Sequence, residues 1–143
     1  MNSLVIYDSN YGSTKKIAQT IAEKLEAEIF AVSEITDDQS FKIDLLVVGS
    51  PVNAFRPSKK MLDFLDTLKS GDLENIKAAA FDTRVKLFIH GDAAGKISKK
   101  LAQAGAEMVA SPQAFYVKGK EGPLFDGEIE KAQEWAEDLK NKI

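Results

Sequence analysis

The segment Asp44–Ser50 constrains the fold more than any other stretch, because it reads Asp-Leu-Leu-Val-Val-Gly-Ser. Four consecutive apolar residues in an extended strand bury both of its faces. Strands of this kind are typical of the middle of a parallel sheet that is covered by helices on each side. We therefore expect an α/β protein in which residues 44–50 form a central strand.

Strand-like and helix-like patterns alternate along the rest of the chain. Strands are predicted at residues 3–8, 28–32, 44–50, 77–82 and within 107–117, where Ser111-Pro112 interrupts the last one. Helices with one apolar face are predicted from Thr14 to about Ala27, from Pro57 to about Leu68, and over residues 92–104 and 128–140. This alternation predicts a three-layer α/β/α sandwich with a five-stranded parallel sheet of order 2-1-3-4-5, formed by residues 1–143 as a single domain.

Composition excludes several classes of site. The 143 residues include no cysteine and one histidine, so disulfides, thiolate metal sites, a cysteine nucleophile and a multi-histidine metal site are ruled out. We predict no metal site and no catalytic residue. The chain shows no basic leader and no apolar run of membrane-spanning length, so a soluble cytoplasmic protein without membrane insertion is expected.

Charge is distributed unevenly, although the net charge of −3 does not indicate nucleic acid as a partner. Residues 51–120 carry 12 basic and 7 acidic side chains, a net of +5, whereas each flanking segment has a net of −4. Such a distribution is compatible with charges scattered over solvated helix faces. It is also compatible with a surface that binds an acidic partner or an anionic small molecule.

The junction between the first predicted strand and the first predicted helix is rich in hydrogen-bonding groups. Free backbone N–H groups and the helix dipole favour an anion at a helix N-terminus, and hydroxyl groups can donate further hydrogen bonds to phosphate oxygens. The junction consists of Ser9, Asn10, Tyr11, Gly12, Ser13 and Thr14. We therefore predict that this loop binds a phosphate monoester.

Two further loops follow the third and fourth predicted strands, at residues 49–57 and 82–91. In a sheet of order 2-1-3-4-5 the carboxyl ends of strands one, three and four are neighbours, and ligands bind beyond such ends. Both loops offer backbone amides and aromatic rings. A glycine-rich stretch at residues 115–124 is expected either to shape a loop near the ligand or a partner, or simply to connect a strand to a helix.

The sequence resembles the flavodoxin family over essentially its whole length. The segment Ser9–Thr14 matches that family's phosphate loop, a hydroxyl residue followed by x-x-Gly-x-Thr, and Gly49-Ser50-Pro51 matches the start of its first flavin-contacting loop. The resemblance implies noncovalent FMN, with the phosphate on the first loop and the isoalloxazine between the other two. The residues that it implies for cofactor binding are Ser9, Asn10, Tyr11, Gly12, Ser13, Thr14, Ser50, Pro51, Val52, Asn53, Ala54, Phe55, Thr83 and Arg84.

The chain departs from the usual flavodoxin pattern at the ring. The loops lack the aromatic residues usual there, Trp135 falls in the last helix where we expect it in the core, and Phe55 and Phe88 could stack on the ring or belong to the core. The loops also carry the cations Arg56, Arg84, Lys86 and His90. A cation beside the flavin stabilises its reduced anionic form, so we expect a potential less negative than in an acidic flavodoxin. His90 could transfer a proton or have no chemical role.

Other protein classes with this topology require motifs that this sequence lacks. A response regulator needs an aspartate after the third strand, and a tyrosine phosphatase needs a cysteine in the first loop. A P-loop NTPase needs Gly-Lys-Ser/Thr, and a dinucleotide-binding protein needs Gly-x-Gly-x-x-Gly.

Three hypotheses about function remain. The protein is an FMN-binding carrier that shuttles electrons between redox protein partners with acidic docking surfaces, an FMN enzyme such as a quinone reductase or protoporphyrinogen-oxidase-like protein, or a scaffold without tight FMN binding. No substrate-binding insertion is visible, which favours the carrier.

Overall fold

The computed structural model describes residues 2–36, 42–87 and 91–143. The strands are β1 (Ser3–Tyr7), β2 (Glu28–Ala31), β3 (Leu45–Asn53), β4 (Arg56–Pro57), β5 (Lys77–Val85), β6 (Glu107–Met108) and β7 (Gln113–Val117). The helices are α1 (Ser13–Leu25), α2 (Lys59–Asp66), α3 (Ala93–Gln103), α4 (Glu128–Lys140) and the short 3₁₀ helix η1 (Val32–Glu34).

The sheet has the predicted order. The strands lie as β2-β1-β3-β5-β6, with β7 also paired to β5, and all of these pairs are parallel. Strands β6 and β7 are the two parts of the predicted fifth strand, separated at Ser111-Pro112 as expected. The additional strand β4 pairs with β3 and is antiparallel to it. The predicted order 2-1-3-4-5 is thus confirmed, with β4 as an unforeseen addition.

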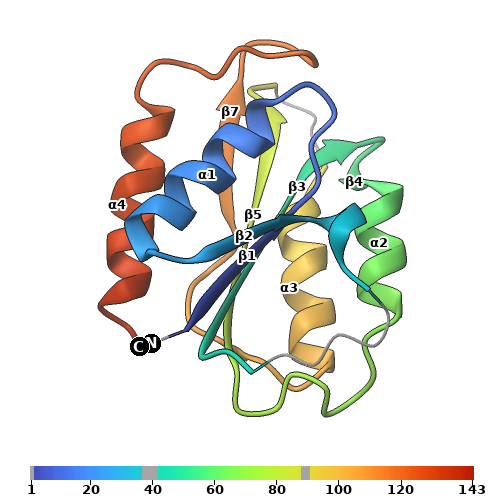
Figure 1. Cartoon of the computed structure of the whole chain (residues 1–143). Coiled ribbons are helices and arrows are strands. Elements are labelled where there is room, and N and C mark those ends of the chain that lie inside the picture. Colours follow the sequence, from blue (N-terminus) through green and yellow to red (C-terminus); the bar gives the residue numbers. More distant parts are fainter. Residues whose placement is uncertain (1, 37–41, 88–90) are drawn as a thin grey trace.

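Helices cover both faces of this sheet, as the continuous apolar strands require (Figure 1). In β3, Leu45 and Val47 contact the layer of α1 and α4, whereas Leu46 and Val48 contact the layer of α2 and α3. Successive residues of a strand point to opposite faces, so each strand contributes to both cores. The predicted inward face of the first helix is buried as expected, at Ile17, Ala18, Ile21, Ala22 and Leu25.

Trp135 belongs to the core, as predicted. Its ring lies 6.1 Å from that of Phe81 and 6.0 Å from that of Phe115, both in edge-to-face geometry. Phe81 pairs with Gly49 across the sheet, and a Cβ atom at position 49 would lie only 2.0 Å from the Phe81 ring. The glycine of the Gly49-Ser50-Pro51 motif therefore has a packing role, because it makes room for a core aromatic ring.

Two strands continue further than the sequence indicates. The predicted strand 77–82 extends to Val85, because Thr83, Arg84 and Val85 pair with β7. The predicted strand 44–50 extends to Asn53 and then turns back at Ala54 and Phe55 to form β4. Thr83 and Arg84 are therefore strand residues, and residues 52–57 of the predicted loop 49–57 form a β-hairpin.

The placement of Pro57 in the first turn of a helix is wrong. Pro57 is the last residue of β4, and helix α2 begins at Lys59. Ser58 caps the helix, since its Oγ accepts the Met61 N–H at 3.2 Å. The Ser58 N–H in turn donates to Ser50 Oγ at 2.9 Å, which fixes the hairpin to the start of the helix.

Candidate functional site

One cleft of about 570 Å³ lies at the carboxyl ends of β1, β3 and β5, the edge at which a ligand was predicted. Three parts of the chain form most of its wall. They are the loop of residues 9–14 (the 9–14 loop), the hairpin of residues 52–57 (the 52–57 hairpin) and the end of β5. The lining residues are Ser9, Asn10, Tyr11, Ser13, Thr14, Pro51, Val52, Asn53, Ala54, Phe55, Thr83, Arg84, Val85, Leu87, Gly91, Val117 and Lys120.

The 9–14 loop is held in shape by its first serine. Ser9 Oγ accepts the Gly12 N–H at 3.1 Å and the Lys15 N–H at 3.3 Å, and Gly12 caps helix α1 in the left-handed conformation. The backbone N–H groups of Tyr11, Ser13 and Thr14 donate to no described residue. Unpaired N–H groups at a helix N-terminus are donors for an anion, so the loop fits a phosphate group.

A buried pair of hydroxyls joins the 9–14 loop to β5. Thr14 Oγ1 and Thr83 Oγ1 are 2.7 Å apart, and both residues are at most 5% exposed. One hydroxyl hydrogen is used within the pair, so the second remains available to a ligand in the cleft. This contact links two residues that the sequence assigned to different loops of one site.

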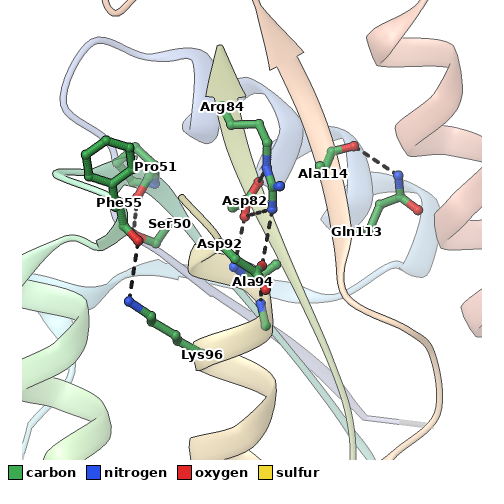
Figure 2. A network of polar contacts seen from close by, with 11 residues as sticks. Ser50, Pro51, Phe55, Asp82, Arg84, Asp92, Ala94, Lys96, Gln113 and Ala114 are labelled. Carbon is green, nitrogen blue, oxygen red and sulfur yellow. Dashed lines mark hydrogen bonds and ion pairs between the residues drawn. The ribbon is translucent and has the colours of Figure 1, made fainter. Parts of the chain in front are cut away.

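The 52–57 hairpin has an unusual turn. Ala54 and Phe55 both have positive φ, at 48° and 69°, as in type I′ turns, where Asn and Gly are the usual residues. Phe55 is 59% exposed and lines the cleft, so it is not a core residue. Its carbonyl oxygen accepts a hydrogen bond from Lys96 Nζ of α3 at 3.4 Å (Figure 2).

A side-chain hydrogen bond joins this hairpin to the 9–14 loop. Asn10 Nδ2 donates to Asn53 Oδ1 at 3.2 Å. The Ser50 side chain, by contrast, is fully buried below the cleft, where its hydroxyl donates to the Pro51 carbonyl at 2.9 Å. Ser50 therefore supports the hairpin from below and does not line the cleft.

The guanidinium of Arg84 is paired with carboxylates. Its Nε donates to Asp82 Oδ1 at 2.9 Å, its Nη2 forms an ion pair with the same fully buried carboxylate, and Nη2 also lies 3.3 Å from Asp92 Oδ1 (Figure 2). Hydrogen bonding to Asp82 raises the pKa of Arg84, with desolvation acting in the opposite direction. Asp82 also accepts the Ala94 N–H at the start of α3, at 2.9 Å.

This pairing changes the electrostatic interpretation of the predicted loop at residues 82–91. The sequence suggested that Arg84 places an uncompensated positive charge beside the ligand, but two carboxylates offset that charge. Lys86 is engaged as well, because its Nζ lies over the rings of Tyr116 and Phe125 at 5.7 and 5.6 Å. Phe88 and His90 lie outside the described residues.

The structure brings together twelve of the fourteen residues that the resemblance implied. The two that do not line the cleft are Gly12, which caps α1, and Ser50, which is buried. Sequence reasoning did not single out Val85, Leu87 and Gly91, which were treated only as loop. Val117 and Lys120 lie in the glycine-rich stretch 115–124, whose composition had suggested a shaped loop near the ligand.

Two negative findings concern only the residues that the structure describes. No group of three or more histidine, cysteine, aspartate or glutamate side chains among them could hold a metal ion. No helix within the described ranges is long and apolar enough to cross a membrane.

Comparisons with known proteins agree with the geometry of the cleft. The sequence model of the family described as Flavodoxin matches residues 5–135. An uncharacterised protein of Methanocaldococcus jannaschii is 30% identical, with 97% of this chain and 98% of that protein covered. A flavodoxin of Aquifex aeolicus is 36% identical over 56% of this chain and 48% of its own length. The crystal structure of oxidised Flavodoxin 1 from Bacillus cereus matches with a TM-score of 0.85, at 22% identity, over 100% of this chain and 99% of that one.

Proposed function

Because the chain belongs to the flavodoxin family, whose noncovalent cofactor is FMN, we propose that it is an electron carrier that shuttles electrons between redox protein partners. When bound, FMN supplies one- and two-electron redox chemistry. The observation that carries the proposal is the composition of the cleft. Unpaired backbone N–H groups lie at one end of it, and exposed apolar side chains line the other.

The two ends of the cleft suit the two parts of a flavin mononucleotide. The 9–14 loop would hold the phosphate through the N–H groups of Tyr11, Ser13 and Thr14 and through nearby hydroxyls. The 52–57 hairpin and the end of β5 would hold the ring, with the apolar side chains of Val52, Phe55 and Leu87 excluding water from its faces. Every residue of the implied site except Gly12 and Ser50 would touch the cofactor.

Exposure of the cleft rim supports the role of a carrier. Tyr11, Phe55 and Leu87 are 51%, 59% and 64% exposed, and all three line the cleft. Large exposed apolar side chains gathered around one opening are characteristic of surfaces that bind other molecules. A partner that covers this rim would come close to the ring, which is what electron transfer between proteins requires.

We further propose that the partner presents acidic groups. Residues 51–120, which supply both the hairpin and the end of β5, have a net charge of +5. Arg56 in the 52–57 hairpin is exposed. Complementary charge accelerates encounter and orients the two proteins, and it makes the association rate fall as salt rises.

The first experiment is a visible absorption spectrum of the purified protein before and after FMN is added. Bound flavin would give the flavin absorption bands together with quenched flavin fluorescence. A protein that binds no flavin would contradict the proposal and would support the scaffold hypothesis.

A second experiment separates the carrier from an FMN enzyme. Stopped-flow mixing of the FMN-loaded protein with NAD(P)H and a quinone is expected to give no saturable turnover, because no substrate-binding insertion is visible in the sequence. Rapid steady-state reduction of the quinone would contradict the carrier and favour the enzyme.

A further inference from the structure

The loop that follows β7 approaches the 9–14 loop, and its Lys120 lines the cleft. Residues 116–125 fold back on themselves through an antiparallel bridge between Val117 and Leu124, in which the Lys118 N–H donates to the Pro123 carbonyl at 2.8 Å and the Phe125 N–H donates to the Tyr116 carbonyl at 3.1 Å. At its tip, the Gly122 N–H donates to the Gly119 carbonyl at 2.9 Å. Lys120 occupies this tight turn and lines the cleft.

The turn lies directly against the helix N-terminus. Gly122 has φ +94°, and a Cβ atom at this position would lie only 2.8 Å from Ser13 Oγ. A positive φ favours glycine, and a larger residue at this position would also require the Ser13 hydroxyl to move. The turn that contains Lys120 therefore lies close to Ser13, the first residue of α1 and part of the 9–14 loop.

Lys120 is the uncompensated charge of the cleft. Among the described residues that line it, the charged side chains are Lys120 and Arg84, and Arg84 is paired with Asp82 and Asp92. No carboxylate in the described parts of the chain forms an ion pair with Lys120. An exposed lysine ammonium without an ion-pair partner suits a dianion bound in the cleft.

We propose that Lys120 is a further phosphate-binding residue, which adds to the preference of this cleft for a phosphorylated flavin over the same flavin without phosphate. The proposal rests on flavin binding in the cleft, as proposed above. The ammonium group adds a charge-assisted hydrogen bond to the neutral donors of the 9–14 loop. Since the lysine is exposed, its contribution falls as ionic strength rises.

The test compares FMN with riboflavin, which shares the ring but lacks the phosphate. Dissociation constants are measured by flavin fluorescence quenching at low and high salt for the wild type and for Lys120→Gln, Lys120→Arg and Lys118→Gln. Lys118 is the matched control, because it lies in the same loop, is exposed and does not line the cleft. Thermal unfolding of each apoprotein checks that the fold is unchanged.

The expected result is a loss of FMN affinity of about 5- to 10-fold in Lys120→Gln at low salt, and a smaller loss at high salt. Riboflavin affinity should change less than about twofold, and Lys120→Arg and Lys118→Gln should bind FMN within about twofold of the wild type. Equal losses for both flavins, or equal losses in Lys120→Gln and Lys118→Gln, would overturn the proposal while leaving the electron carrier intact. A wild type that binds neither flavin would overturn both.

A second variant tests whether the position of the turn determines the effect of Lys120 on FMN binding. Gly122→Ala would push the turn away from Ser13 and carry Lys120 with it. We expect Lys120→Gln to have a smaller effect on FMN affinity in this background than in the wild type, because the two changes remove the same contact. Fully additive effects would show that Lys120 acts independently of the turn and would contradict the proposed geometry.

Discussion

The two ends of the cleft are built in different ways. The 9–14 loop is shaped by contacts within a few residues, such as those from Ser9 Oγ to the N–H groups of Gly12 and Lys15. The 52–57 hairpin and the end of β5 depend on contacts between distant segments, such as those of Lys96 with Phe55 and of Thr83 with β7. Local contacts therefore shape the backbone donors of the phosphate end, to which Thr83 and Lys120 are added from distant segments, whereas the whole ring end exists only once the sheet and α3 are assembled.

The largest expected effect is a loss of stability on replacement of Asp82, the buried carboxylate that pairs with Arg84 at the ring end. Asp82→Ala leaves Arg84 without its main partner in a site where Arg84 is only 10% exposed. Removing one member of a buried pair costs about 3–5 kcal/mol, so we expect a loss of unfolding free energy of about 3 kcal/mol in urea denaturation.

The double variant Asp82→Asn with Arg84→Met is the control, since replacing both members of such a pair is often close to neutral. It should recover most of the lost stability. Should Asp82→Ala unfold at the wild-type urea concentration, the view that the ring end depends on this distant contact would be wrong.

A second prediction addresses the 9–14 loop. Ser9→Ala removes the acceptor that orients two backbone N–H groups, so the phosphate donors lose their preorganisation. We expect FMN affinity to fall about fivefold and riboflavin affinity to change little, since a single hydrogen-bonding group contributes about 1 kcal/mol. Fluorescence titration with the two flavins measures both effects, and parallel losses would show that the two ends are not independent.

The third prediction makes the corresponding change at the ring end, in the 52–57 hairpin. Phe55→Ala removes an exposed ring from the cleft wall, so apoprotein stability should stay within about 0.5 kcal/mol of the wild type. FMN and riboflavin affinities should fall together, by about three- to fivefold, because the lost contact is to the ring that both share. A loss confined to FMN would contradict the assignment of Phe55 to the ring end.

The smallest effect is expected for the contact that joins the two ends. Asn10→Ala removes an exposed hydrogen bond to Asn53 of 3.2 Å. We expect a loss of stability below about 0.5 kcal/mol, and a change in affinity for either flavin of less than about twofold. Thermal unfolding and titration would measure both, and a large effect would show that the ends are coupled through this pair.

Two features of the sequence allowed a prediction from local patterns alone, one for the sheet and one for the 9–14 loop. Residues 45–48 are apolar on both faces, which requires a covered parallel sheet, and residues 9–14 combine hydroxyls with a glycine at a strand–helix junction. Both signals are local. The covered parallel sheet could therefore be predicted without any knowledge of distant contacts, and phosphate binding by the 9–14 loop could be proposed on the same basis.

The hairpin could not be predicted, because its turn lacks the usual signal. Ala and Phe at two positive-φ positions replace the Asn and Gly by which such turns are recognised, and Pro57 suggested a helix start. The pairing of Arg84 was equally hidden. It requires Asp82 to be its neighbour on one face of β5 and α3 to direct a backbone N–H at the same carboxylate.

The aromatic cluster of the core has a consequence for measurement. Trp135 is the single tryptophan of the chain, it is 8% exposed, and its neighbour Phe81 belongs to β5, the strand that ends at the cleft. Its emission therefore comes from one defined environment, and a flavin bound nearby would accept excitation energy from it. The protein thus contains its own optical reporter, which can follow both unfolding and cofactor occupancy in every variant without an added label.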